Sequence, residues 1–426
     1  MNFRLLLLVS LLATRAMAQP GNWSADTLRH RAQRALKAHQ YAISGQLFSQ
    51  QAAALTWQSA QADAHYQAAG AYAQAGDAPA ALAQLQAAYR RGWCDTDELR
   101  QDPNLISLRE LPAFQQLARC MARDRARQRD PDRAQLVTTD ITHFWQASDR
   151  AARDTAHRRQ IYQRDYFGRA TVGLQDYYES RIFSLPKFVR NLNQKPAFYR
   201  AIRPIAGPSS AQVAQIRAGF RRLKELYPDA YFPNVYFVIG RYAAVGTVSR
   251  NGMLLSADML AGAPPVPTEE LSEWERASLT PAADLPAVVA HEHIHLLQHP
   301  SPDHSLLRGA IEEGMADFLA ALTTQRPLHA RQHAYGRQHE AALWAAFCQE
   351  MAGDNWDNWL FNSEQEAAGR PGDLGYFIGF RICEAYYEQM ADKKRAVRDL
   401  LHITDYPAFL AQSHYAERLA AQPSKR

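Results

Sequence analysis

The stretch "AHEHIHLLQHP", residues 290–300, holds four histidines and one acid, Glu292. Successive residues of a helix are separated by about 100°, so only positions three or four apart share a face. His291 and His295 therefore share a face, whereas His293 points elsewhere. The remaining pattern is His291-Glu292-x-x-His295, in which two imidazoles bind a zinc ion and the glutamate acts on a bound water molecule.

The residues around this stretch predict that it is helical. Asp284 can cap a helix at its N-terminus, and Pro286 suits the first turn. The next four residues, 287–290, are apolar, and Pro300 ends the predicted helix. The two histidines should therefore lie on one side of a largely buried helix.

A catalytic zinc ion takes three protein ligands and leaves a fourth position for water. His299 lies eight residues after His291, which places it about 12 Å further along a helix at 1.5 Å per residue. Metal–nitrogen bonds of about 2 Å cannot span that separation. The longer pattern HExxHxxGxxH also fails, because Gln298 and Ser301 occupy its glycine and third histidine positions. The third ligand must come from another segment.

The segment "RGAIEEGMADFLAAL", residues 308–322, is predicted to be a second helix that supplies this ligand. Glu313 and Asp317 are four residues apart and share a face. If the two helices pack antiparallel, Glu313 meets the histidine pair, and Asp317 accepts the second ring N–H of a liganding histidine. Glu312 is a rival ligand, but only Glu313 has an aspartate four residues later and a small residue, Gly314, directly after it, which would let the helices approach closely.

This arrangement of HExxH followed by ExxxD resembles the gluzincin zinc peptidases. More narrowly, residues from about 138 to 415 resemble an exported bacterial family of predicted zinc-dependent proteases. The similar stretches, besides the metal motifs, are "DITHFWQASDR" (140–150), "NGMLLSADM" (251–259) and "RPGDLGYFIGFRICEAYYEQ" (370–389). The resemblance implies a zinc metallopeptidase, although His293 departs from the pattern. The alternatives are a zinc hydrolase of a non-peptide bond, or an interaction adaptor with a structural metal site.

The implied mechanism assigns a role to each residue of the site. Zn²⁺ on His291, His295 and Glu313 would activate a water molecule, with Glu292 as general base. Tyr376 is the candidate donor to the oxyanion, with Arg381 second. The ligand set would also accept Co or Mn, and zinc is chosen on ligand type and availability. The remaining histidines are expected to be exposed or locally bonded: His293, His299, His304, His329, His333 and His339.

The N-terminal stretch "MNFRLLLLVSLLATRAMAQP" predicts export to the periplasm or beyond the cell. Arg4 precedes an apolar run, residues 5–13, and "AMA" offers a signal-peptide cleavage site near Ala18. The run is too short to span a bilayer, and no later stretch approaches the roughly 18 apolar residues needed. Because no cysteine directly follows the cleavage site, we expect no lipoprotein anchor. Because no later stretch is apolar for long enough, we also expect no membrane span.

Charge and cysteine content limit the partners and crosslinks. The formal net charge is +5, and removal of Arg4 and Arg15 with the signal peptide leaves +5 − 2 = +3, which is too mild to favour nucleic acid. The expected partners are a peptide or protein substrate and a protein bound by the N-terminal region.

Export permits disulfides. Proximity favours Cys94–Cys120 and Cys348–Cys383, but free thiols are equally ordinary, so the pairing stays open.

The chain is predicted to be mainly α, with two domains after a signal peptide at 1–18. Residues 19–122 form the first domain. Within it, "ADAHYQAAGAYAQAGDAPAALAQLQAAYRRG" (62–92) predicts helix, a turn at Gly76-Asp77, and helix. A similar copy some 35–40 residues upstream resembles tetratricopeptide (TPR) repeats. Such a region can dock a partner or act as a spacer.

A linker at 123–137 leads to the second domain, residues 138–426, which is predicted to be α+β and zincin-like with a small sheet. Its first part is rich in aromatic residues, which favours a packed core. Strands are predicted at 235–239 and near 252–257, separated by glycines. On the resemblance alone, 252–257 is assigned as the edge strand that pairs with substrate. Residues 284–415 are expected to be mostly helical.

Overall fold

A computed structural model describes residues 23–363 and 369–421, so the predicted signal peptide and its cleavage near Ala18 lie outside the described residues. The described chain is mainly helical with one small sheet, as predicted. It forms two compact units, and the second contains the residues from Gln116 onward together with Trp57–Ser59 and Gly92–Thr96. The predicted boundaries of the two domains stay predictions.

The first unit is built from helical hairpins. Its helices are α1 (Ala25–Lys37), α2 (Tyr41–Ala54), α3 (Gln58–Gln74), α4 (Ala78–Arg90) and α5 (Thr96–Gln101), followed by the 3₁₀ helix η1 (Pro103–Leu108). The turn between α3 and α4 is the expected one: Gly76 has a φ of +80°, and Asp77 caps α4 by accepting a hydrogen bond from the Ala80 N–H at 3.0 Å. The helix–turn–helix predicted within 62–92 is confirmed, whereas its likeness to TPR repeats stays a prediction.

The second unit contains a four-stranded sheet. The strands are β1 (Leu136–Val137), β2 (Asn234–Val238), β3 (Gly246–Ser249) and β4 (Gly252–Ser256), in the order β1-β2-β4-β3. β2 pairs parallel with β1 and with β4, while β3 and β4 are antiparallel. The stretch 123–137, predicted to be a linker, contains the end of α6 (Pro112–Arg127) and β1.

The predicted position of the edge strand is wrong. β4 lies between β2 and β3, and every one of its residues is buried. The outer strand is β3, which is only half buried. The tight turn at 250–251 joins it to β4, and the two strands pair antiparallel. A strand that is paired on both sides has no free backbone groups for a further strand.

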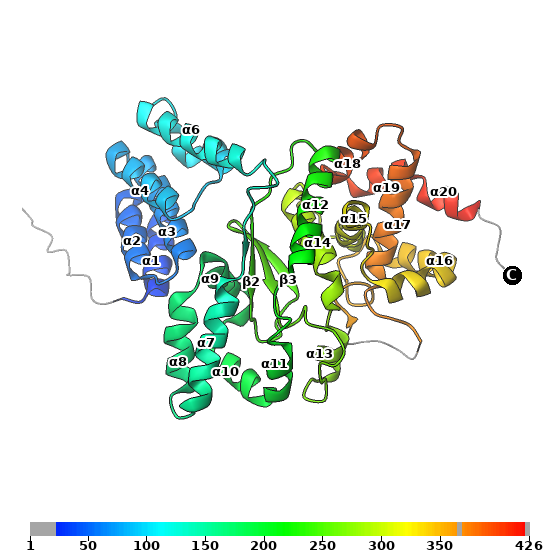
Figure 1. Ribbon diagram of the computed structural model, residues 1–426. Coiled ribbons are helices and arrows are strands. Elements are labelled where there is room, and N and C mark those ends of the chain that lie inside the picture. Colours follow the sequence, from blue (N-terminus) through cyan, green and yellow to red (C-terminus); the bar gives the residue numbers. More distant parts are fainter. Residues whose placement is uncertain (1–22, 364–368, 422–426) are drawn as a thin grey trace, which may run out of the picture. The chain divides into compact units, whose positions relative to one another are not determined.

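Helices cover the sheet on both sides, with α7 and α9 on one side and α14 on the other (Figure 1). The helices that precede β2 are α7 (Thr139–Arg153), α8 (Arg158–Asp165), α9 (Val172–Tyr177), α10 (Leu185–Gln194), α11 (Pro196–Ile202) and α12 (Ser210–Leu226). Their aromatic side chains form the predicted core: Phe144, Tyr166 and Phe188 are buried and in mutual ring contact.

The C-terminal half of the second unit is helical, as expected. It consists of α13 (Glu273–Ala277), α14 (Leu285–Leu297), α15 (Leu306–Thr324), α16 (Ala330–Glu350), α17 (Leu374–Gln389), α18 (Lys393–Leu401), α19 (Tyr406–Ser413) and α20 (Tyr415–Ala420). Figure 1 shows α15 nearly end-on while α14 runs along the page, so these helices cross steeply. The predicted antiparallel packing of the two helices is therefore wrong.

All four cysteines are free thiols. None of the described helices is long and apolar enough to cross a bilayer.

Candidate metal centre

α14 presents His291 and His295 on the same face, as their spacing predicts. The helix begins at Leu285, with Pro286 in the first turn, where a missing N–H costs no hydrogen bond. Asp284 precedes it, but its side chain makes no capping hydrogen bond and instead forms an ion pair with Arg326. Most of α14 is buried, so both imidazoles point into the protein interior.

α15 supplies the two acids that the sequence analysis selected, and a close contact with α17 holds it in place. A Cβ on Gly314 would lie 2.1 Å from the backbone nitrogen of Phe380, and a Cβ on Gly379 would lie 1.7 Å from the carbonyl oxygen of Ala310. Only glycine permits that approach of two backbones. The small residue after Glu313 was predicted to bring α15 close to α14; it brings α15 close to α17 instead.

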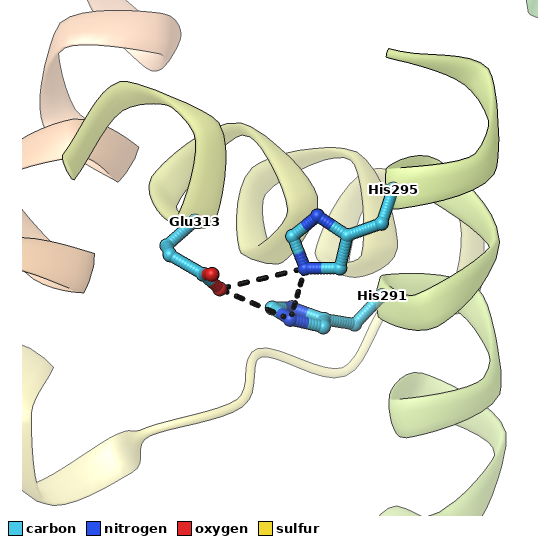
Figure 2. A group of neighbouring side chains, drawn as sticks. All are labelled: His291, His295 and Glu313. Atoms are coloured by element: carbon cyan, nitrogen blue, oxygen red, sulfur yellow. Dashed lines mark hydrogen bonds and ion pairs between the residues drawn. The ribbon is translucent and has the colours of Figure 1, made fainter. Parts of the chain in front are cut away.

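Three potential ligand atoms converge between α14 and α15 (Figure 2). The Nε2 atoms of His291 and His295 are 3.0 Å apart, and Oε2 of Glu313 lies 3.5 Å from the first and 3.4 Å from the second. Tetrahedral zinc with bonds of 2.0–2.1 Å separates its ligand atoms by about 3.3 Å. The three predicted ligands therefore have the spacing that a zinc ion requires.

The outer hydrogen bonds show that all three converging atoms carry lone pairs. Nδ1 of His291 donates to Asp317 at 2.8 Å. Gln298 donates from its amide nitrogen to the carbonyl oxygen of Glu312 at 2.7 Å, so its own carbonyl faces Nδ1 of His295 at 2.9 Å and accepts from it. With both Nδ1 atoms protonated, both Nε2 atoms are acceptors in the neutral rings. Two imidazole lone pairs and a carboxylate facing one another require a cation between them.

Asp317 takes the orienting position predicted for it, and it has a second partner that the sequence analysis missed. Its side chain is fully buried, and besides His291 it accepts a hydrogen bond from Nδ1 of His329 at 2.6 Å. His329 was expected to be exposed or locally bonded. It lies immediately before α16, twelve residues after Asp317, and no helical spacing in the sequence links the two. Gln298, the residue that caps the C-terminal end of α14, was also missed, although its position three residues after His295 is a helical spacing that could have indicated it.

The pKa values of the cluster follow from these contacts. Burial alone would lower the pKa of His291 and of His295, but the carboxylates of Asp317 and Glu313 outweigh it for His291, as Glu313 does for His295, and both values are raised. Burial alone would raise the pKa of Glu313, but the two imidazoles hold it well below its usual range. In the absence of a metal ion, protons supply the positive charge that the converging atoms demand.

Glu292 lies half-buried beside the histidines and points toward β3. A Cβ on Gly246 would lie 2.3 Å from Oε1 of Glu292, so the strand can pass this carboxylate only because residue 246 is glycine. Burial raises the pKa of Glu292, the two imidazoles oppose that rise, Glu313 adds to it, and Arg181 also opposes it. The carboxylate that was predicted to be the general base thus lies beside the histidine ligands and is not itself one of the three potential ligands.

The two predicted oxyanion donors end up in different places. Tyr376, on α17, hydrogen bonds Glu313, and its ring lies 6.3 Å from that of His291 in a stacked orientation. Burial and the Glu313 charge raise the pKa of Tyr376 well above its usual value, so its hydroxyl stays a donor. Arg381 forms ion pairs with Glu340 and Glu384 instead. The separation of five residues places the two on different sides of α17.

The rival ligand Glu312 is engaged elsewhere. One of its carboxylate oxygens pairs with Nη2 of Arg308 at 2.8 Å, and the other accepts a hydrogen bond from the Tyr406 hydroxyl at 2.8 Å. Adjacent helical residues diverge by about 100°. Glu313 therefore faces the histidines, and Glu312 faces α19.

Comparison with known proteins gives one match. Residues 133–417 match the model of the family described as "Gliding motility protein GldB". A search of curated proteins and a search of solved structures each give no match. The matched residues include the whole sheet and every residue of the metal cluster.

This match overturns the predicted membership of a zinc-protease family and the peptidase function that followed from it. The physical reason is that HExxH and ExxxD specify a pair of helices with converging ligands, and such a pair says nothing about the bond or partner that the protein recognises. Because the match covers more than half of the chain, the protein belongs to the gliding motility protein GldB family.

Proposed function

We propose that this chain is a zinc-binding member of the GldB family whose metal centre carries out a hydrolytic reaction. The observation that carries the proposal is the convergence of three lone-pair atoms, on His291, His295 and Glu313, at separations of 3.0–3.5 Å. Each of the two histidines is held in the required tautomer by a hydrogen bond on its other nitrogen. That second layer of contacts is characteristic of metal-binding histidines.

The residues around the three ligands support a hydrolytic role over a purely structural one. When bound at such a site, zinc acts as a Lewis acid and lowers the pKa of water toward 7. Glu292 is a half-buried carboxylate that is not one of the three ligands and can accept a proton from that water. Tyr376 offers a hydroxyl donor beside Glu313. A structural site would have a fourth protein ligand and no use for an adjacent base.

The family supports an exported, envelope-associated location, since it is a lipoprotein family, and its description as a motility family supports protein partners. The helical hairpins of the first unit are the proposed docking surface for such a partner, because stacked helix pairs of this kind present continuous surfaces for protein binding.

Zinc content tests the metal site. Elemental analysis of the purified chain should give about one zinc per molecule. Glu313→Ala should lose most of it. The matched control is Glu312→Ala, which removes the neighbouring carboxylate that pairs with Arg308 and should leave the zinc content unchanged. Equal loss in both variants, or full retention in Glu313→Ala, would contradict the ligand set.

A second experiment separates metal binding from chemistry. Glu292→Gln should retain zinc, because Glu292 is not among the converging ligands. It should lower the zinc-dependent hydrolysis of a p-nitrophenyl ester by about 100-fold, the usual scale for loss of a general base. If zinc-loaded wild type shows no hydrolysis above the Glu292→Gln level, the centre is structural and the hydrolytic part of the proposal is wrong.

A further inference from the structure

A second functional element lies beside the metal centre, at the outer strand of the sheet. Arg181 belongs to the short π-helical turn at Tyr178–Ile182, and its Nη2 donates to Oγ1 of Thr247 on β3 at 2.9 Å. The preceding residue on β3 is Gly246, which lies against Glu292. Arg181 is near enough for its charge to act on the Glu292 carboxylate. Arg181 and the proposed base thus contact neighbouring residues of the outer strand.

Arg181 has hydrogen-bonding capacity that the protein does not use. A guanidinium carries five N–H donors and stays charged at every relevant pH. Within the described part of the chain, Thr247 is the one side chain that accepts from it, and the Nε atom is buried with no partner. A buried donor without an acceptor costs free energy, about 1–3 kcal/mol and more for a charged group. A ligand that supplied the missing acceptor would remove this cost.

The backbone carbonyls of the turn that carries Arg181 are held by a second arginine, Arg241. Arg241 donates from Nε to the carbonyl oxygen of Ile182 and from Nη2 to that of Arg181, both at 3.1 Å. Arg241 itself has a φ of +61°, and Phe183, next to the clamped turn, has a φ of +57°.

A buried acid, Asp258, holds the segment that contains Arg241. Tyr242, which also has a φ of +61°, donates its N–H to the fully buried Asp258 at 3.0 Å, and Gly240 donates to the same carboxylate at 3.0 Å. Left-handed conformations of bulky residues cost about 1–2 kcal/mol each and concentrate at functional sites. Three such residues lie in the segments that adjoin Arg181, namely Phe183, Arg241 and Tyr242.

We propose that Arg181 is the anion-recognition residue of the metal centre, and that the molecule bound there carries a carboxylate or phosphate group that Arg181 engages. This inference rests on the proposed function, because it names the substrate class of the same site. A planar guanidinium fork matches the geometry of both anions through paired charge-assisted hydrogen bonds. Apart from the histidines, the other charged side chains described around the cluster are acids, namely Glu292, Glu313, Asp317 and Asp373, so Arg181 supplies the permanent positive charge that selects for an anion.

The test uses zinc-loaded full chain and three hydroxamates that bind zinc through the same group. Acetohydroxamate has no charged arm, succinic acid monohydroxamate carries a carboxylate, and phosphonoacetohydroxamate carries a phosphonate. Wild type should bind one or both charged probes more tightly than acetohydroxamate, and the tighter of the two identifies the anion. Arg181→Gln should weaken that probe by about 10- to 100-fold, the scale of a charge-assisted hydrogen bond, and leave acetohydroxamate affinity unchanged.

Two further variants keep the result interpretable. Arg181→Lys should recover part of the preference, since it keeps the charge but loses the fork. Thr247→Val leaves Arg181 intact and removes the acceptor that orients it, so it should cause a smaller loss. The matched control for net charge is Arg221→Gln, whose guanidinium pairs with Asp132, and this variant should behave as wild type.

The outcomes distinguish the two proposals. If wild type binds zinc but shows no preference for a charged probe, or if Arg181→Gln weakens all three probes equally, the role of Arg181 is overturned and the metal site stands. If wild type binds no zinc and no hydroxamate, the proposed function fails and the role of Arg181 fails with it.

Discussion

Two groups of histidines lie within the same helical half of the protein and have opposite electrostatic environments. On the carboxylate side, His291, His295 and His329 surround Glu313 and Asp317, and these acids overcome burial and raise the histidine pKa values. On the apolar side, burial lowers the pKa of His293 and of His333 to about 4. α14 contributes to both groups, and so does the start of α16.

The apolar side shows what a buried histidine does without a charged partner. His293 is fully buried between the rings of Phe220 and Phe232, and its single hydrogen bond, at 2.6 Å, joins Nε2 to the carbonyl oxygen of Tyr231. His333 packs against Phe377 and Phe380, and no described residue hydrogen bonds either of its nitrogens. These rings act as packing groups that stay neutral. Residue type therefore does not assign a histidine to the metal centre; the acids facing it do.

The largest effect is expected on the carboxylate side, from Asp317→Ala. The variant leaves His291 and His329 buried without their acceptor. It should lower the free energy of unfolding by about 3 kcal/mol, the scale of breaking a buried ion pair. Zinc affinity should fall about 10- to 100-fold, as for other orienting residues. Urea unfolding and competition with a chelator measure the two quantities.

Asp317→Asn sharpens this result, because it keeps one acceptor oxygen and removes the charge. It should lie between wild type and Asp317→Ala in both measurements. Unchanged zinc affinity in the alanine variant would show that His291 does not need Asp317 to hold its orientation.

The low pKa of His333, on the apolar side, predicts that the stability of the protein depends on pH. The pKa of His333 is about 4 in the folded protein, against about 6.5 in an unfolded chain, so the unfolded state takes up the proton first as the pH falls. The stability contributed by the neutral ring is complete above pH 6.5 and is lost between pH 6.5 and 4. At pH 5 the loss is about 2 kcal/mol.

His333→Leu should remove this term while keeping the contacts with Phe377 and Phe380. The free energy of unfolding of the variant, relative to wild type, should therefore rise by about 2 kcal/mol between pH 7 and pH 5. The measurement is urea unfolding of metal-free protein at both pH values. A constant difference would mean that His333 is solvated or paired in the folded state.

The position of Glu292 can be tested through the strand backbone that its carboxylate approaches. Gly246→Ala places a Cβ where Oε1 of Glu292 lies, and Glu292 has to move away. We expect unchanged zinc content and a fall in ester hydrolysis of about tenfold, since a general base must be within hydrogen-bonding reach of its proton. Hydrolysis at the wild-type rate would show that Glu292 acts from another position.

The smallest effect on stability is expected from Tyr376→Phe, which removes one hydroxyl hydrogen bond to Glu313. The free energy of unfolding should fall by about 1 kcal/mol, and zinc should be retained. If the hydroxyl also serves an oxyanion, ester hydrolysis should fall by about 100-fold in the same variant. Loss of zinc would instead make Tyr376 essential for the position of Glu313.

Local spacing predicted the parts of this protein that depend on local geometry. Residues four apart on a helix share a face, so His291 with His295, and Glu313 with Asp317, could be paired before any fold was known. The turn at Gly76-Asp77 and the strands around 235 and 252 also follow from local preferences. The protease family and the peptide-bond substrate did not follow, because the metal pattern does not encode them.

Tertiary structure alone decided the contacts between segments that are distant in sequence. Nothing local links Asp317 to His329, or Arg181 to the strand beside Glu292, because each pair is joined by helix crossings and loops whose course depends on the whole core. The same is true of Gly314, which meets α17 and not α14, and of β4, which lies inside the sheet. Sequence by itself determined which side chains share a helical face, since 3.6 residues per turn is a property of the backbone. Which faces meet was decided by packing, since many pairings of apolar faces are locally equivalent and only the complete core distinguishes them.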